Sequence, residues 1–112
     1  MNIISSDEAR LVINKWKNES STLVVLLTDN GSMEQFASCV IDLQENLLIL
    51  SRYSSAGVWL LWLDARFAYG EPREAPVEIR ARSSGKFVSC LELVWSSRAK
   101  CLLYELAEPI TH

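Results

Sequence analysis

The sequence predicts a mainly β protein in which one N-terminal amphipathic helix is followed by antiparallel strands, within a single domain covering residues 1–112. Two observations predict this class. Of the 112 residues, 49% are hydrophobic, and most stand in short runs bounded by Ser, Gly, Asn or Asp, which is typical of strands separated by turns. A helix start signal followed by helical spacing occurs near the N-terminus. The charged fraction of 22% beside so much apolar content excludes a disordered chain.

The helix is expected over residues 6–17. Ser5, followed three residues later by Glu8, forms the capping-box pattern that begins many helices. The next apolar residues recur at the spacing of one helix face, namely Ala9, Val12, Ile13 and Trp16. We expect this apolar stripe to lie across one opening of the sheet or barrel and to shield its core.

Three strands are expected in the first half of the chain, near residues 22–28, 33–42 and 46–53. The run Leu23–Leu27 is continuously apolar, so its strand should be buried on both faces. Asp29, Asn30 and Gly31 follow it and provide a tight hairpin turn. The second strand therefore pairs back on the first, and a short connection from Asp42 to Asn46 leads into the third.

Four further strands are expected near residues 58–69, 77–82, 87–95 and 101–106. Between Val58 and Tyr69 the apolar residues alternate as in a long strand, although Trp59, Trp62, Leu63 and Arg66 would also share one helix face. The residues between Gly70 and Pro76 make a loop. The remaining strands, separated by short serine-containing turns, form an antiparallel meander.

The segment 22–50 resembles the first sequence motif of the Sm-like (LSm) proteins. In that motif a hairpin glycine is followed eleven residues later by an aspartate and four residues after that by an asparagine, as are Gly31, Asp42 and Asn46 here. The resemblance implies a small, strongly bent antiparallel barrel, for which this chain offers five to seven strands. It also implies assembly into rings and binding of single-stranded uridine-rich RNA by the Asp42–Asn46 loop.

The residues that the resemblance assigns to RNA are Asp42, Gln44, Asn46 and Arg98. Gln44 stands where RNA-binding members place an aromatic ring that stacks on a base, a large part of single-strand affinity. Arg98 is followed by Ala99 in place of the glycine of the second motif, and Phe36 stands where the family bends its second strand at a glycine. With a net charge of −3, the chain has no general attraction for phosphate backbones, so RNA is a disfavoured partner.

Catalysis has few candidate groups. The single histidine is His112, the last residue, so the usual general base is missing. The sequence contains no metal-ligand cluster or phosphate loop, and we expect no cofactor, no metal and no catalytic residue. A small enzyme with a carboxylate pocket remains an alternative.

The cysteines and the N-terminal segment indicate the cellular compartment of the protein. Cys39, Cys90 and Cys101 are far apart among apolar neighbours, so we expect reduced core residues. Met1–Arg10 lacks the basic and apolar regions of a signal peptide, and no apolar run has the length of a membrane-spanning helix. The sequence therefore predicts a cytoplasmic protein that does not contact membranes.

Apolar residues on both faces of several expected strands bear on function. They occur in Leu23–Leu27, Leu47–Leu50 and Val58–Leu63, and exceed what the inward face of one small barrel can bury. Extra elements or another subunit must cover them, and we expect a homo-oligomer or a protein partner. The preferred function is an oligomerising or protein-interaction module with an Sm-like barrel, ahead of RNA binding and of the enzyme alternative.

Overall fold

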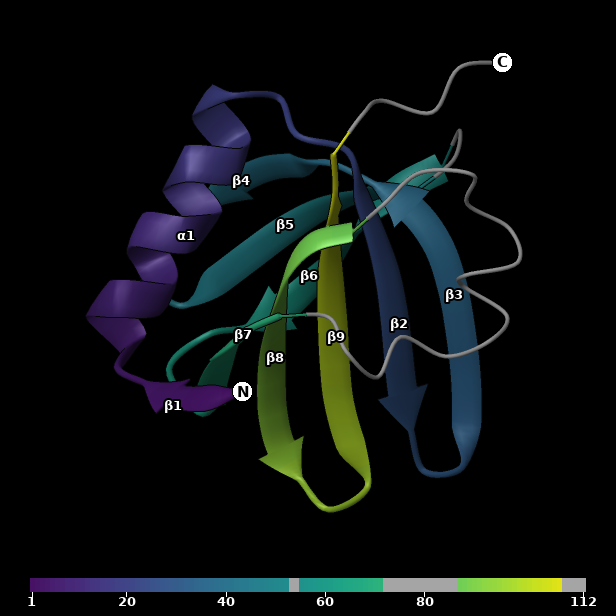
Figure 1. Ribbon diagram of the computed structural model, residues 1–112. Coiled ribbons are helices and arrows are strands. Elements are labelled where there is room, and N and C mark those ends of the chain that lie inside the picture. Colours follow the sequence, from purple (N-terminus) through teal and green to yellow (C-terminus); the bar gives the residue numbers. More distant parts are fainter. Residues whose placement is uncertain (53–54, 72–86, 108–112) are drawn as a thin grey trace.

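The computed structural model describes residues 1–52, 55–71 and 87–107, and it confirms a mainly β fold with one helix near the N-terminus (Figure 1). The elements in chain order are β1 (Asn2–Ile4), α1 (Ser6–Asn18), β2 (Leu23–Asp29), β3 (Ser32–Ser38), β4 (Val40–Leu43), β5 (Leu47–Arg52), β6 (Ser55–Leu61), β7 (Arg66–Gly70), β8 (Phe87–Ser96) and β9 (Ala99–Leu106). The expected helix and the strands near 22–28, 46–53, 87–95 and 101–106 are present, with slightly different ends. The strand expected at 77–82 lies outside the described residues. β1 was not predicted, because three residues are too few to show a period.

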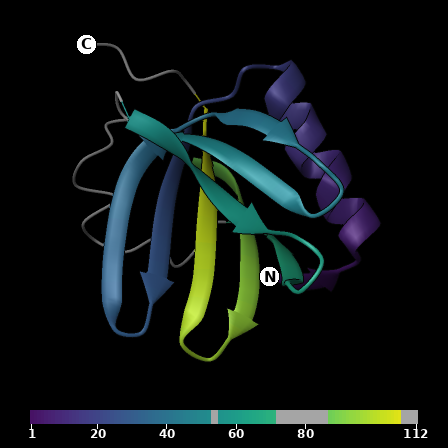
Figure 2. The same ribbon diagram turned by 180° about the vertical axis from the view of Figure 1, so that it is seen from behind.

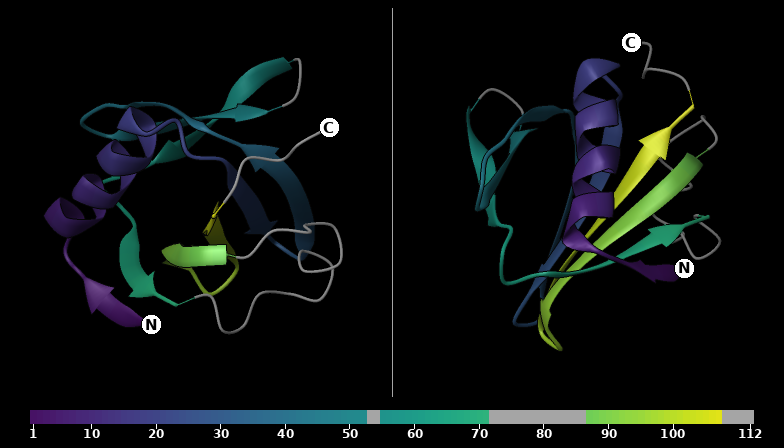
Figure 3. Two further views of the ribbon diagram at one scale, coloured as in Figure 1. Left: turned by 45° about the horizontal axis from the view of Figure 1, so that its top comes forward. Right: turned by 90° about the vertical axis from the view of Figure 1, so that its left-hand side faces the viewer.

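The strands form two antiparallel sheets on either side of the main core. The larger sheet has six strands in the order β1-β7-β8-β9-β2-β3, and the smaller has three in the order β4-β5-β6. Figure 3 shows the two sheets, with α1 beside the space between them. Among the residues that the structure describes, the hydrogen-bonded ladders make two sheets and no closed barrel, so the strongly bent barrel is not confirmed.

The prediction of one strand over residues 33–42 was wrong, because the chain changes sheets at Cys39. β3 belongs to the larger sheet and β4 to the smaller one. Ser51, on β5, holds this corner: its carbonyl accepts a bond from Ser38 Oγ at 2.7 Å, and its Oγ accepts one from the Cys39 amide at 2.9 Å. The chain turns the corner without a glycine, and Phe36 lies in the core just before it.

The prediction of one strand over residues 58–69, and its helical alternative, were also wrong. β6 ends at Leu61, and the chain turns through Trp62–Ala65 before β7 begins in the other sheet. Trp62 is fully buried at this second corner, where its indole Nε1 donates a hydrogen bond to Ser6 Oγ at 2.8 Å. That bond and the burial of Trp62 depend on the position of α1, which is far away in the sequence.

Helix α1 begins and packs as its sequence indicates. Ser5 Oγ accepts a hydrogen bond from the Glu8 amide at 3.1 Å, and the Glu8 carboxylate accepts one from the Ser5 amide. Ala9, Ile13 and Trp16 are buried in the core, and α1 contacts β4 in one sheet and β7 in the other. The apolar stripe therefore covers the gap between the two sheets, as the sequence led us to expect.

The core has two parts. The main cluster joins α1 to the inner faces of both sheets and includes Ile13, Leu48 and Leu103. A second cluster, with Tyr104 and Val24 among its members, lies on the other face of the six-stranded sheet. β2 contributes to both clusters, which confirms that the run Leu23–Leu27 is buried on both of its faces along most of its length.

Candidate protein-interaction surface

Asp42, the aspartate of the predicted RNA loop, is held by contacts within the chain. Its Oδ1 lies 3.0 Å from Lys17 Nζ on α1 and accepts the Leu43 amide at 2.9 Å. Gln44 Nε2 donates to Oδ2 at 3.5 Å. The Lys17 ammonium first, and then the Leu43 amide and Gln44, hold the pKa of Asp42 below its usual value of 3.8. This carboxylate therefore fastens the end of β4 to the helix.

Asn46 and Gln44 are likewise engaged in holding the loop. Asn46 Oδ1 accepts a hydrogen bond from the Leu63 amide at 2.7 Å, and the Asn46 carbonyl accepts one from the Trp62 amide at 3.0 Å. The Gln44 carbonyl accepts a bond from the Arg10 guanidinium at 3.0 Å. That guanidinium also lies 5.2 Å from the centre of the Trp62 ring, within the range of a cation–π contact. The loop is thus tied both to α1 and to the corner between β6 and β7.

Arg98 lies elsewhere. It belongs to the turn between β8 and β9, where its carbonyl accepts the Asn30 amide at 2.9 Å from the turn between β2 and β3. Figure 1 shows these two turns together at one end of the six-stranded sheet, away from the loop between β4 and β5. The structure therefore brings Asp42, Gln44 and Asn46 together and leaves Arg98 at a different site.

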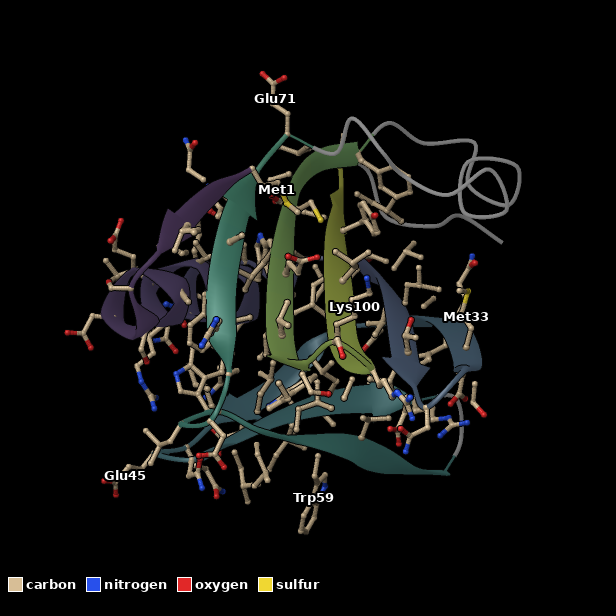
Figure 4. The ribbon with its side chains drawn as sticks, turned by 90° about the horizontal axis from the view of Figure 1, so that it is seen from below. Met1, Met33, Glu45, Trp59, Glu71 and Lys100 are labelled. Atoms are coloured by element: carbon tan, nitrogen blue, oxygen red, sulfur yellow. The ribbon has the colours of Figure 1, made fainter. Side chains whose placement is uncertain are left out.

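An exposed apolar surface lies over the three-stranded sheet, and we call it the β6 surface. It consists of Ile41, Trp59, Leu61 and Leu63, with exposed fractions of 49%, 66%, 49% and 60%. Leu60 and Trp62, which alternate with these side chains, are buried, so the strand period places the exposed residues on the outer face. Figure 2 views the molecule with β6 in front, and Figure 4 shows Trp59 projecting away from the body of the protein.

A groove of about 240 Å³ adjoins the β6 surface where the two sheets diverge. Trp59 and Leu61 line it from β6, Trp95 lines it from β8, and Asp29 lies at the end of β2. The Trp95 indole Nε1 donates to the Leu61 carbonyl at 2.8 Å, so this tryptophan sits against the edge of β6. The groove extends the apolar area from the sheet face to the strand edge.

Apart from Leu61, which Trp95 contacts, the edge of β6 is the least protected strand edge in the described part of the chain. The edge strands there are β1, β3, β4 and β6. β1 has three residues, β3 carries Glu34 in an ion pair with Arg52, and β4 has four residues including Asp42. β6 has seven residues, with neither a charge nor a proline. Charges, prolines and short length are the usual means by which proteins prevent pairing at an edge.

The enzyme alternative requires a cleft in which several carboxylates converge. A second cavity, of about 440 Å³, lies beside β1, β7 and β8, and the charged side chains lining it are Arg66 and Glu92. Each of the two cavities thus receives a single carboxylate from the described residues. Those residues also contain no group of three side chains able to hold a metal ion.

The cysteines differ from one another in exposure. Burial raises the pKa of the Cys90 thiol to about 12 and raises that of Cys101 further, so both are poor nucleophiles. The expectation of core cysteines is therefore confirmed for these two, whereas Cys39 is exposed at the corner between the sheets. In the residues that the structure describes, no helix is long and apolar enough to cross a membrane.

Comparison of the chain with family models, with curated proteins and with solved structures gave no match. The assignment of a functional surface therefore depends on the geometry above. The sequence already showed an excess of apolar residues in Val58–Leu63. It did not show that Trp59, Leu61 and Leu63 stay exposed, because that depends on where the two sheets meet.

Proposed function

We propose that this protein is an oligomerising protein-interaction module and that the β6 surface, with the adjoining edge of β6, is its contact region. The observation that carries the proposal is an uncharged seven-residue edge strand that exposes 66% of Trp59. Tryptophan is among the residues that contribute most to binding energy at protein interfaces. A contiguous apolar surface beside an unprotected edge is typical of a site that another polypeptide covers.

Several features support an Sm-like architecture for this module. The helix precedes every strand except β1, and the segment after the first hairpin bends sharply at Cys39 to enter a second sheet. Asn30 and Gly31 both have positive φ, 49° and 87°, as a tight hairpin turn requires. These features agree with the element order and bending that the resemblance implies, and we propose the Sm-like barrel on that basis.

RNA binding has weaker support. Asp42, Gln44 and Asn46 make the intramolecular contacts described above, and no aromatic ring stands at position 44 for a base to stack on. Titration with a short uridine-rich oligonucleotide at low salt tests this alternative. Saturable binding that Asn46→Ala and Arg98→Ala weaken would favour it over our proposal.

Molar mass in solution tests the proposed function. Light scattering at micromolar concentration should give a defined oligomer for the wild-type protein. We expect Leu61→Lys with Leu63→Lys to lower the mass toward that of the monomer, because two charges then stand in the contact region. Ile3→Lys with Leu11→Lys is the matched control, since those side chains are 90% and 71% exposed at other sites. A wild-type protein that is strictly monomeric would contradict the proposal.

A further inference from the structure

We infer that the partner is a second copy of this chain and that the two β6 edges pair antiparallel, with Trp59 of each copy beside Trp59 of the other on a two-fold axis. This inference rests on the proposed function and specifies its partner and register. It follows from the direction of the backbone groups of β6, from the side chains that would meet, and from the absence of charge along this edge.

The β5–β6 ladder fixes which backbone groups of β6 point outward. Leu61 lies opposite Leu47 and Trp59 lies opposite Ile49. Since the Trp62 amide donates to the Asn46 carbonyl, the alternation of an antiparallel ladder directs the N–H and C=O groups of Trp59 and Leu61 away from β5. The bond from the Trp95 indole to the Leu61 carbonyl agrees with that direction.

The contact of Trp95 selects among the registers. A two-fold axis at Leu60 or Leu61 would require the Leu61 carbonyl in its central hydrogen bonds, and the Trp95 indole already donates to it at 2.8 Å. An axis at Trp59 instead uses the N–H and C=O of Trp59 in both copies, giving a hydrogen-bonded pair with two central bonds. The Leu61 carbonyl then faces the Gly57 amide of the other copy in a flanking pair, so the Trp95 contact bears on the two ends of this pairing and not on its central bonds.

The side chains fit this register. Directly opposed residues of a hydrogen-bonded pair have Cα atoms about 5.5 Å apart, so two Trp59 rings on the outer face can pack together. Gly57 has no side chain to obstruct the opposing Leu61. A Cβ atom built on Gly57 would lie 2.5 Å from the Leu50 carbonyl oxygen and 3.6 Å from Ile41 Cδ1. Ile41 of the β6 surface thus lies over Gly57, on the face toward which the opposing Leu61 projects.

The charge pattern favours a second copy as the occupant. Two-fold pairing brings each residue near its own counterpart, so any charge near the axis would face a like charge and oppose association. The segment Ser55–Leu61 has none, whereas β3 carries Glu34 and β4 carries Asp42. Among the edge strands longer than three residues in the described part of the chain, β6 is thus the one that can pair with its own copy without bringing like charges together.

A charge-complementation experiment tests the self-pairing of Trp59. We expect Trp59→Lys and Trp59→Glu each to be monomeric at concentrations where the wild-type protein is dimeric. Mixed in equal amounts, the two variants should form a heterodimer about tenfold tighter, or more, than either variant alone, because unlike charges then face one another. Leu63→Lys mixed with Leu63→Glu is the matched control and should show no such gain. Circular dichroism checks that every variant is folded.

Disulfide trapping gives a second readout that does not depend on affinity. In a Cys39→Ser background, Trp59→Cys should form a covalent dimer on mild oxidation, because a Cα separation of about 5.5 Å suits a disulfide. Leu63→Cys, which is similarly accessible, should form no covalent dimer. Cys90 and Cys101 are buried and do not compete.

The outcomes separate this inference from the proposed function. A wild-type protein that stays monomeric overturns both. If the wild-type protein is an oligomer but the two Trp59 charge variants do not complement each other and Trp59→Cys does not cross-link, the β6 self-pairing is wrong while the proposed function stands. Complementation together with selective cross-linking at position 59 supports the inference.

Discussion

At the scale of single residues, Asp42 and Asn46 show that the loop between β4 and β5 has a structural role. Asp42 binds Lys17 of α1, and Asn46 binds the Leu63 amide just beyond β6. Each of the two residues thus connects the short loop to a residue that is distant in the sequence. Such contacts explain the aspartate and the asparagine by themselves, through hydrogen bonds to helix and backbone.

Asp42→Asn should lower the stability of the protein near neutral pH. The folded-state pKa of Asp42 is depressed, chiefly by Lys17. A depressed carboxyl pKa contributes stability above the unfolded-state pKa, and that contribution is lost as the pH falls through the folded-state pKa. The gap in unfolding free energy between wild type and variant should therefore be constant at neutral pH and close at pH values below about 4. Denaturant unfolding at several pH values measures it.

Glu45→Gln provides the control for that experiment. It removes a carboxylate from the same loop without touching the contact between Lys17 and Asp42. We expect its difference from wild type to be smaller than that of Asp42→Asn at neutral pH. An Asp42→Asn effect that grows as the pH falls would show that the assigned ion pair does not stabilise the fold.

At the scale of elements, sequence patterns predicted what depends on neighbouring residues. The helix follows from Ser5, Glu8 and its apolar stripe, and the buried strand β2 follows from the run Leu23–Leu27. The two sheet corners could not be predicted in this way. They depend on Ser51 for the corner at Cys39 and on Ser6 and Asn46 for the corner at Trp62, all distant in the sequence. Alternation continues through both corners, so each pair of strands looked like one.

The candidate site residues also divide into those set by neighbouring residues and those set by distant ones. The resemblance assigned Asp42, Gln44, Asn46 and Arg98 to one site. The first three are close in the chain and lie on one loop, whereas the structure places Arg98 on another turn. The exposure of Trp59 could not be predicted, because a strand of alternating apolar residues does not reveal which face the opposite sheet covers.

Gly57→Ala should destabilise the protein more than an exchange of glycine for alanine usually does. The new Cβ would lie 2.5 Å from the backbone oxygen of Leu50, in the ladder irregularity between β5 and β6, and backbone cannot move aside without disturbing the sheet. We expect a loss of about 1–3 kcal/mol, typical of overpacking, measured by denaturant unfolding.

Gly70→Ala is the matched comparison. Its new Cβ would come within 3.2 Å of Met1 Cα, but Met1 is 58% exposed and lies outside the strands, so it can shift. The loss should therefore be under about 1 kcal/mol. Equal losses for the two variants would mean that the close approach of Gly57 to Leu50 does not constrain the ladder between β5 and β6.

At the scale of the whole molecule, α1 packs against both sheets. It contacts β4 and β7, and its buried residues belong to the same cluster as Leu48 of the smaller sheet and Leu103 of the larger. A cavity made under the helix should therefore loosen the far side of the fold as well. Cys101, on β9 and fully buried in this cluster, provides the probe.

Ile13→Ala should make Cys101 reactive without touching it. Removing a buried isoleucine to alanine costs about 2–5 kcal/mol. A thiol that reacts only when the protein opens then reacts about thirtyfold faster or more, if closing is fast compared with the chemistry. A thiol reagent at mildly alkaline pH should modify Cys39 rapidly in both proteins and Cys101 slowly in wild type. Leu11→Ala on the exposed face of the helix is the control and should leave the slow rate unchanged. A slow phase that Ile13→Ala also leaves unchanged would mean that β9 opens independently of the helix, and that the two sheets do not unfold as one unit.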